Sequence, residues 1–466
     1  MRPALLSLLL LLGCAPWNQP QNQPLAGENA PLADPATGEG ELYVGLAFSG
    51  GGMRATAFAY GMLEELRAAG LLSEVRLVSG VSGGSVMAAQ FGLRGPAGLE
   101  GFRERFLVTD AERYMVTSGA NPVTIVKGIA GGVNGRETFG RYLDEALFQG
   151  ATFADLRKTG IKTWINATDM ANNVPFLFSP ETFDALCSDL SKVRISEAVA
   201  ASAAYPLVFT PIVLEAHQGQ CDYREPDWLT AARYNPEATA AMRAHARALE
   251  SYTDPREVRF VKLLDGGITD NFGTTGLAVE RARAQVPYAP LTAEEAVRLR
   301  RMLFLVANAG VEQDYDWTQR VAGPGGVNLA MSIAGSAMAA ASRSGYDSMR
   351  GELRLWEMEL IEWRCALPLD EVRRLRGTVA GWDCTDVKLF VGEASFASLA
   401  KDMRDAVNQV PTRLKLDTAQ VDAVISAGRM ATRLTPEFNG FLASVAGDVE
   451  ARIAAEGKRR VVPLGN

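Results

Sequence analysis

Short apolar runs alternate with helix-forming stretches along most of the chain, and this alternation predicts the fold. The first two runs are residues 42–49 and 75–79, each followed by glycines and then by helix formers. A β-α-β-α order implies a parallel sheet with right-handed crossovers. Later apolar runs fit the same sheet, at residues 162–167, 259–264, 302–307 and 387–391. The pattern therefore predicts an α/β fold with a mainly parallel central sheet.

Helices are predicted between and after these strands. The clearest cover residues 55–69, 140–148, 293–301 and 418–427. The last of them has Asp417 as a plausible N-cap and Gly428 just beyond its end. Residues 41–440 show no internal repeat and no sharp linker, so we expect one domain there, followed by a helical tail over residues 441–466.

Two segments are expected to be insertions in this domain. Residues 215–257 carry a cysteine, several prolines and an Ala/Arg-rich helix around residues 237–249, and are expected to cover one edge of the sheet. Residues 324–341 are rich in Gly and Ala. A buried helix of small residues and a membrane-facing surface or lid are both open for this second segment.

The first forty residues have the pattern of an exported lipoprotein. A charged start and an apolar run over residues 4–12 make a signal peptide that is too short to span a bilayer. Its end, Leu11-Leu12-Gly13-Cys14, resembles a bacterial lipobox, so we expect residues 1–13 to be removed and Cys14 to carry lipid. An ordinary signal peptide with a chance cysteine is the alternative. Residues 14–40, rich in Pro, Asn, Gln and Gly, are expected to form a disordered tether.

This reading places the protein in the bacterial cell envelope, held on a membrane by its lipid. The residue after the cysteine is Ala15 and not an acidic residue, which favours the outer membrane in a cell with two membranes. The chain has 466 residues, 47% of them apolar, a net charge of -7 and a pI near 5.3. It can bury a large core, and it lacks the basic face of a nucleic-acid binder, so no nucleic-acid partner is expected.

The remaining cysteines are an even set: Cys187, Cys221, Cys365 and Cys384. Export permits disulfides, and the four residues allow three pairings or four free thiols. We predict Cys187 with Cys221 and Cys365 with Cys384, which closes the two shortest loops. Because the chain has no Cys-x-x-Cys pair and only two histidines, which are not spaced as ligands, no metal or other cofactor is expected.

The strongest chemical signal is Gly80-Val81-Ser82-Gly83-Gly84, between an apolar strand and a helix. It matches the Gly-x-Ser-x-Gly nucleophile elbow, in which a tight strand-to-helix turn presents a serine at a helix N-terminus. The flanking glycines let strand and helix pass close to each other. A Gly-rich turn without catalytic meaning is the alternative for this motif taken alone.

A second glycine-rich turn, Gly50-Gly51-Gly52, follows the first strand and precedes a helix. Three successive glycines expose backbone N–H groups that suit an oxyanion. A nucleotide-binding loop is the competing reading. The P-loop pattern is absent, and the next strand ends in Ser79 and not in the acidic residue that would hold a ribose.

A strand-end carboxylate completes the set in Asp265-Gly266-Gly267. Taken alone, Asp-Gly-Gly is usually only a turn. The three elements together are expected to end parallel strands on one edge of one sheet, where α/β proteins place ligands. Asp265 is therefore a candidate base for Ser82. Since His217 and His245 are not predicted at strand ends, the sequence favours a Ser-Asp dyad over a Ser-His-Asp triad.

With these blocks in this order, the chain resembles the patatin-like phospholipases over about residues 41–435. Residues 50–54 correspond to the family's Gly-Gly-Gly-x-Arg block, and residues 166–169 and 201–206 resemble stretches found between the serine and the aspartate. Ala55 departs from the glycine common after the arginine. The residues expected to support the motifs are Arg54, Gly80, Gly84, Gly266 and Gly267.

The resemblance implies a three-layer α/β/α fold and a metal-independent serine hydrolase of lipid acyl esters, of phospholipase A or lysophospholipase type. Ser82 would be the nucleophile, Asp265 the base and residues 50–52 the oxyanion hole, with an acyl-enzyme intermediate. The expected partner is a lipid or phospholipid substrate. An acyltransferase or thioesterase with the same site, or a catalytically silent lipid-binding protein, remains the alternative.

Overall fold

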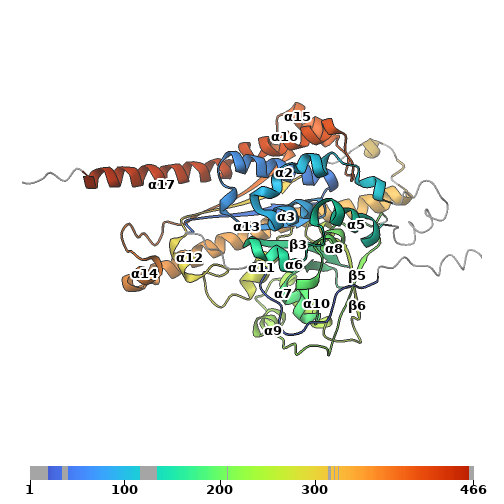
Figure 1. The fold of residues 1–466 in the computed structure, drawn as a ribbon, viewed down its shortest axis with the longest axis horizontal. Helices are drawn as coiled ribbons and strands as arrows, with labels where there is room; N and C mark the ends of the chain where they lie inside the picture. The colour runs from blue at the N-terminus through green and yellow to red at the C-terminus, as the bar shows by residue number, and fades with distance from the viewer. Residues whose placement is uncertain are drawn as a thin grey trace, which may run out of the picture.

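A mixed β-sheet forms the centre of the protein (Figure 1). The computed structural model describes residues 19–33, 40–115, 134–206, 208–312, 316–319, 321–323 and 325–460. Within these residues the sheet has eight strands in the order β5-β6-β3-β2-β1-β7-β8, with β4 paired to β3. The strands are β1 (Leu42–Phe48), β2 (Val75–Val81), β3 (Lys162–Asp169), β4 (Val174–Leu177), β5 (Ile212–Glu215), β6 (Phe260–Asp265), β7 (Arg301–Asn308) and β8 (Lys388–Ser395).

The sheet is parallel across β3, β2, β1, β7 and β8, which confirms the predicted mainly parallel α/β fold. Strands β4 and β6 pair antiparallel with β3, and β5 pairs antiparallel with β6. The expectation that β6 runs parallel to the others is therefore wrong, because an apolar run predicts a strand but not its direction. Asp265 nonetheless reaches the carboxyl end of β3, where it is paired with Ala167.

Helices cover both faces of the sheet, giving three layers. On β3, Thr163 faces Gly92 of α3, where a methyl group would lie 2.1 Å from the threonine hydroxyl. The next side chain, Trp164, faces Gly276 of α11 on the opposite side, as strand alternation requires. The helices are α2 (Gly52–Ala68), α3 (Gly83–Arg94), α5 (Arg141–Leu143), α6 (Phe153–Leu156), α7 (Pro180–Ala185), α8 (Ile195–Ser202), α9 (Asp227–Tyr234), α10 (Ala240–Ser251), α11 (Thr275–Ala282), α12 (Ala293–Arg298), α13 (Gly326–Ala366), α14 (Leu369–Arg376), α15 (Lys401–Asn408), α16 (Thr418–Leu434) and α17 (Pro436–Arg460).

Helices α2 and α16 cross at very short range. A methyl group at Gly61 of α2 would lie 2.3 Å from the carbonyl oxygen of Ile425, and one at Gly428 of α16 would lie 2.2 Å from that of Phe58. Gly428 was expected just beyond the end of a helix, but α16 continues to Leu434. This glycine serves close packing and does not end the helix.

Residues 19–33, part of the expected disordered tether, lie along the surface of the domain. Leu25 is buried and donates its N–H to the carbonyl of Cys187 at 2.8 Å. The amide of Asn29 donates to Asp184 at 2.8 Å and to Ser188 at 3.0 Å. Over these residues the chain is therefore held by specific contacts. Cys14 and the signal peptide lie outside the described residues.

Both predicted disulfides are present, which confirms the pairing. Cys187 and Cys221 join the segment after α7 to the insertion between β5 and β6, and Cys365 and Cys384 join the end of α13 to the segment before β8. The insertion carries α9 and α10, and α10 packs against β4 and α7. Among the described helices, none combines the length and hydropathy needed to cross a bilayer.

Candidate active site

Ser82 occupies a strained turn between β2 and α3. Its backbone angles, φ 52° and ψ -122°, lie where a side chain is costly, by about 1–3 kcal/mol. The neighbouring glycines make the turn possible. A methyl group at Gly80 would lie 2.6 Å from the carbonyl oxygen of Gly84, and one at Gly84 would lie 2.3 Å from that of Phe48. The glycine pattern therefore allows strand, turn and helix to pack with Ser82 at the apex.

Hydrogen bonds from neighbouring elements hold this turn. The N–H of Ser82 donates to the hydroxyl of Ser202, at the end of α8, at 2.8 Å. That hydroxyl donates in turn to the carbonyl of Asn166 at 2.6 Å, and the Asn166 side chain donates to the carbonyl of Gly80 at 3.1 Å. On the other side, the Ser85 hydroxyl donates to the carbonyl of Ser82 at 2.6 Å. Such support compensates for a strained conformation.

Asp265 ends β6 with its carboxylate buried beside Ser82. The Ser82 side chain lies beside this carboxylate and favours its charged form, and the N–H of Gly267 donates to its Oδ1 at 2.9 Å. Burial raises the pKa of Asp265 to about 6, although the Ser82 side chain and the Gly267 N–H favour the charged form. The Thr168 hydroxyl donates to the Asp265 carbonyl at 2.8 Å and fixes the strand end. The structure thus brings the predicted serine and aspartate together.

The Gly50-Gly51-Gly52 turn lies against the serine turn. A methyl group at Gly50 would lie 3.4 Å from Cβ of Ser82, and one at Gly83 would lie 1.9 Å from the carbonyl oxygen of Gly52. Gly51 and Gly52 have φ of 140° and 60°, values that residues with side chains rarely adopt. They place the start of α2, with its exposed N–H groups, at the site.

The three glycines differ in their hydrogen bonds. The N–H of Gly50 donates to Oδ1 of Asn271 at 3.1 Å and to its carbonyl oxygen at 3.3 Å. The N–H groups of Gly51 and Gly52 have no acceptor within the part of the chain that the structure describes. Of the three N–H groups predicted to form the oxyanion hole, those of Gly51 and Gly52 are therefore available in this structure, whereas that of Gly50 holds the turn in place.

Two other motif residues support the backbone. Arg54 is buried in the first turn of α2, and its guanidinium donates to the carbonyls of Ala309 at 3.1 Å and Val410 at 2.7 Å. Burial lowers its pKa to about 10. Gly266 allows a close approach of two chain segments, because a methyl group there would lie 2.3 Å from the carbonyl oxygen of Asn166. Both residues therefore position the site.

Helix α13 covers the site, a feature that the motifs did not reveal. The Asn271 side chain donates to the hydroxyl of Ser342 on α13 at 2.8 Å. The methyl carbon of Met338 lies 2.7 Å from where a Cβ at Gly267 would stand and 3.6 Å from the corresponding point at Gly50. Asn271 belongs to the loop six residues after Asp265, and no motif used above contains it. Its role follows only from its position in space.

Both histidines are accounted for by contacts elsewhere. The His217 ring lies 3.2 Å from the carbonyl oxygen of Asn22. His245 is buried on α10 beside the backbone of Pro175, and burial lowers its pKa to about 4. Over the described ranges, no three His, Cys, Asp or Glu side chains are grouped as a metal site would require.

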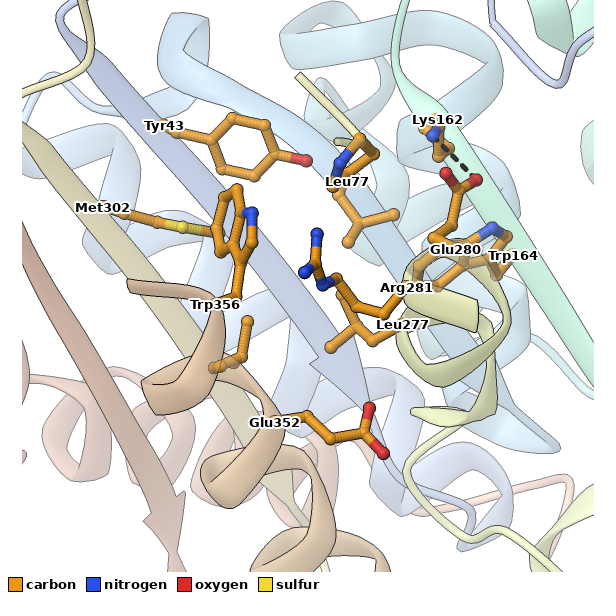
Figure 2. A pocket seen from close by; sticks show the side chains of 12 residues that line it. Tyr43, Leu77, Lys162, Trp164, Leu277, Glu280, Arg281, Met302, Glu352 and Trp356 are labelled. Atoms are coloured by element: carbon orange, nitrogen blue, oxygen red, sulfur yellow. Dashed lines mark hydrogen bonds and ion pairs between the residues drawn. The ribbon is translucent and has the colours of Figure 1, made fainter. Parts of the chain in front are cut away.

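The cavity in Figure 2 lies at the end of the sheet opposite to Ser82 and Asp265. It measures about 20 Å³ and is lined by residues near the amino ends of strands, including Tyr43 of β1 and Leu77 of β2, together with Trp356 of α13. Five residues of extended strand, roughly 16 Å, separate Leu77 from Ser82. A larger cavity of about 540 Å³ shares Tyr43 and Lys162 with it. Neither cavity is lined by the serine or the aspartate.

A comparison with known families is consistent with this geometry. The model for the patatin-like phospholipase family matches residues 46–278, half of the chain. The chain belongs to this family. Membership supports a lipid hydrolase activity. No curated protein matches the sequence.

The solved structures that resemble this patatin-like chain are distant. Human GIVD cytosolic phospholipase A2 has 11% identity and a TM-score of 0.39, over 88% of this chain and 63% of that one. VipD from Legionella pneumophila has 14% identity and a TM-score of 0.29, over 93% and 73%. ExoU of Pseudomonas aeruginosa, solved in complex with SpcU, has 16% identity and a TM-score of 0.28, over 93% and 79%. The chain thus spans less than two thirds of the human enzyme.

Proposed function

We propose that the protein is a serine lipid acyl hydrolase of phospholipase A or lysophospholipase type, acting through an acyl-enzyme. The observation that supports this most directly is the position of the Ser82 side chain beside the buried carboxylate of Asp265, at the end of β6. Membership of the patatin-like family supports a lipid substrate. The alternatives of an acyltransferase, a thioesterase and a silent lipid-binding protein are outcomes of the test below.

Asp265 acts as the general base in this proposal. The Oγ of Ser82 attacks the ester carbonyl carbon while its proton moves to the Asp265 carboxylate. A pKa of about 6 suits this step, because the group is ionised near neutral pH and is more basic than an ordinary aspartate. When the carbon–oxygen bond of the ester breaks, Asp265 returns the proton to the leaving alcohol. The acyl group then remains on Ser82.

The available N–H groups of Gly51 and Gly52 stabilise the oxyanion of the tetrahedral intermediate. They lie at the N-terminus of α2, where the helix dipole favours negative charge. A single oxyanion donor contributes about 3 kcal/mol to transition-state stabilisation. In the second half of the cycle Asp265 takes a proton from water, whose oxygen attacks the acyl carbon, and the fatty acid leaves as Ser82 regains its proton.

The proposed location is the bacterial cell envelope, with Cys14 lipidated, which would keep the enzyme at a membrane that contains its substrate.

The test compares wild type with Ser82→Ala and Asp265→Asn on phospholipid vesicles, with released fatty acid measured by mass spectrometry. Both variants should lose hydrolysis while remaining folded, and the double variant should be no worse than either alone. A fluorophosphonate probe should label wild type at Ser82. Ser73→Ala, at an exposed serine outside the site, is the matched control and should retain labelling and activity.

Other outcomes separate the alternatives. His217→Ala and His245→Ala should keep most of the activity per folded molecule. Activity that survives Asp265→Asn but is lost with a histidine substitution would contradict the dyad. Labelling without fatty-acid release, together with acylation of an added lysophospholipid, would identify an acyltransferase, and cleavage of thioesters alone would identify a thioesterase. A wild type with neither labelling nor turnover would be a binding protein.

A further inference from the structure

Helix α13 is composed of two unlike halves. Residues 326–342 contain no Asp, Glu, Lys or Arg, although the second half is rich in them from Arg343 onward. Figure 1 shows α13 as a long helix crossing the molecule toward α14. A helix exposed to water ordinarily has a charged or strongly polar outer face. The absence of charge over residues 326–342 therefore requires an explanation.

The side chains that the structure describes in the uncharged half are exposed or half-buried. The side chain of Ile333 is 62% exposed and that of Leu329 is 46% exposed. These two residues are four apart, so they lie on the same side of the helix, one turn from each other. Between them, Ser332 is also exposed. The outer side of this half, called the strip below, thus combines two large apolar side chains with exposed serines and carries no charge.

The opposite side of the same half covers the active site. Met338 follows Ile333 by five positions, which places it about 140° around the helix. Its methyl carbon lies close to Gly50 and Gly267, and Ser342, one turn further, accepts the hydrogen bond from Asn271. Ser82 and Asp265 are both buried in this structure. Helix α13 is one of the elements packed against this buried site.

We propose that residues 326–342 form a docking surface for lipid, in which Leu329 and Ile333 insert into the acyl boundary of a membrane. The inference builds on the proposed function, since it names what brings the lipid to the site. Exposed Leu329 and Ile333 on a strip without charge suit the acyl region of a neutral membrane better than a charged protein partner. Because Met338 is on the reverse side, insertion of the strip draws it away from Gly267 and opens the site.

The binding test uses the full chain with Cys14→Ser, which removes anchoring by attached lipid, and Ser82→Ala, which removes turnover. Co-sedimentation with phosphatidylcholine vesicles should show binding, and Leu329→Glu with Ile333→Glu should weaken it about tenfold or more. The matched control is Leu355→Glu with Met358→Glu. These residues are 56% and 67% exposed on the charged half of the same helix, and binding should be unchanged.

Activity provides the second measurement, in the chain that retains Ser82. Leu329→Glu with Ile333→Glu should reduce hydrolysis of vesicle phospholipid and leave hydrolysis of a soluble short-chain ester unchanged. Equal vesicle binding by this variant and its control would overturn the proposal. The proposal would also be overturned if the protein without vesicles were a dimer and Leu329→Glu with Ile333→Glu made it a monomer. A second copy of the chain would then be what covers the strip.

The two proposals fail in different ways. Vesicle binding that depends on Leu329 and Ile333, without ester hydrolysis by the chain with Ser82, would leave the docking surface standing and remove the proposed function. Hydrolysis that depends on Ser82, with vesicle binding indifferent to Leu329 and Ile333, would do the reverse.

Discussion

The side chain of Asn271 accepts a hydrogen bond from the N–H of Gly50 at 3.1 Å. Its Nδ2 donates to the hydroxyl of Ser342 on α13 at 2.8 Å. One amide group thus connects the glycine turn beneath the site to the helix above it. A shift of α13 that breaks the bond to Ser342 frees the Asn271 side chain to reorient. The position of α13 is therefore coupled to the geometry of the glycine turn, which carries the N–H donors.

Asn271→Ala should lower kcat about tenfold or more with little change in KM, because the glycine turn loses its fixed geometry and the oxyanion exists only near the transition state. Steady-state kinetics on a soluble ester would measure this. Asn439→Ala is the control, since the Asn439 amide donates to the carbonyls of Arg433 and Thr435 at the α16–α17 junction. A fall in melting temperature that accounts for the whole loss, with kcat per folded molecule unchanged, would contradict the positioning role.

Gly51→Ala should reduce kcat more than it raises KM. A Cβ at Gly51, where φ is 140°, would lie 3.3 Å from Cβ of Ala55, so the turn must shift and its N–H with it. Gly70→Ala controls for backbone strain, because Gly70 follows the same helix, also has a positive φ of 72°, and has open space around it. Gly70→Ala should cost stability but keep kcat. Equal kcat losses in the two variants would argue against an oxyanion role.

The raised pKa of Asp265 predicts the pH dependence of activity. The base must be ionised, so kcat/KM should be constant above pH 7 and fall as the pH drops through about 6, by about tenfold per pH unit below it. The profile should be the same in His217→Ala. Full activity retained down to pH 4 would show that Asp265 is not the base.

The same shift predicts a gain in stability from Asp265→Asn. The folded-state pKa lies above the usual value of 3.8, so ionising the buried carboxyl opposes folding as the pH rises from about 4 to 6. At pH 8 the variant should therefore melt at a higher temperature than wild type, and at pH 3.5 the gain should vanish. Thermal melts at the two pH values would measure it. A variant that is less stable at both would contradict the burial argument.

Cys14→Ser should release the protein from the membrane fraction of expressing cells after a high-salt wash, because the expected lipid would be lost. Cell fractionation followed by immunoblotting would measure this. Binding through the uncharged residues of α13 does not weaken in salt, so both chains in this comparison carry Leu329→Glu and Ile333→Glu. A variant that stays as firmly bound as wild type would rule out the anchor.

Much of the fold follows from local pattern. The strands of the parallel part of the sheet are continuous apolar runs, and such runs can be recognised from the sequence alone. The direction of β6 was not predictable in this way, because it depends on how the chain returns from the insertion after β5. From sequence, Gly428 predicts a helix end, because a glycine that ends a helix and one that lets two helices touch look alike until the second helix is placed.

The residues of the site likewise fall into two groups, those that local sequence predicts and those that it does not. Ser82, Asp265 and the three glycines carry a signal in their own neighbours, and the structure brings them together. Ser202 and Met338 carry none. Ser202 matters because the end of α8 reaches the N–H of Ser82, and Met338 because α13 crosses above Gly267. Residues that act through a distant segment become visible only when that segment is placed.

The support of the glycine turn has a consequence for shortened forms of the protein. Strand β1 lies between β2 and β7, the N–H of Met53 donates to the carbonyl of Arg413 at 2.8 Å, and Arg54 donates to that of Val410. The carbonyls and β7 all come after residue 278, where the family match ends. A premature stop between residues 278 and 301 leaves every proposed catalytic residue encoded, yet turns β1 into an unprotected edge strand and removes the carbonyls that seat the first turn of α2.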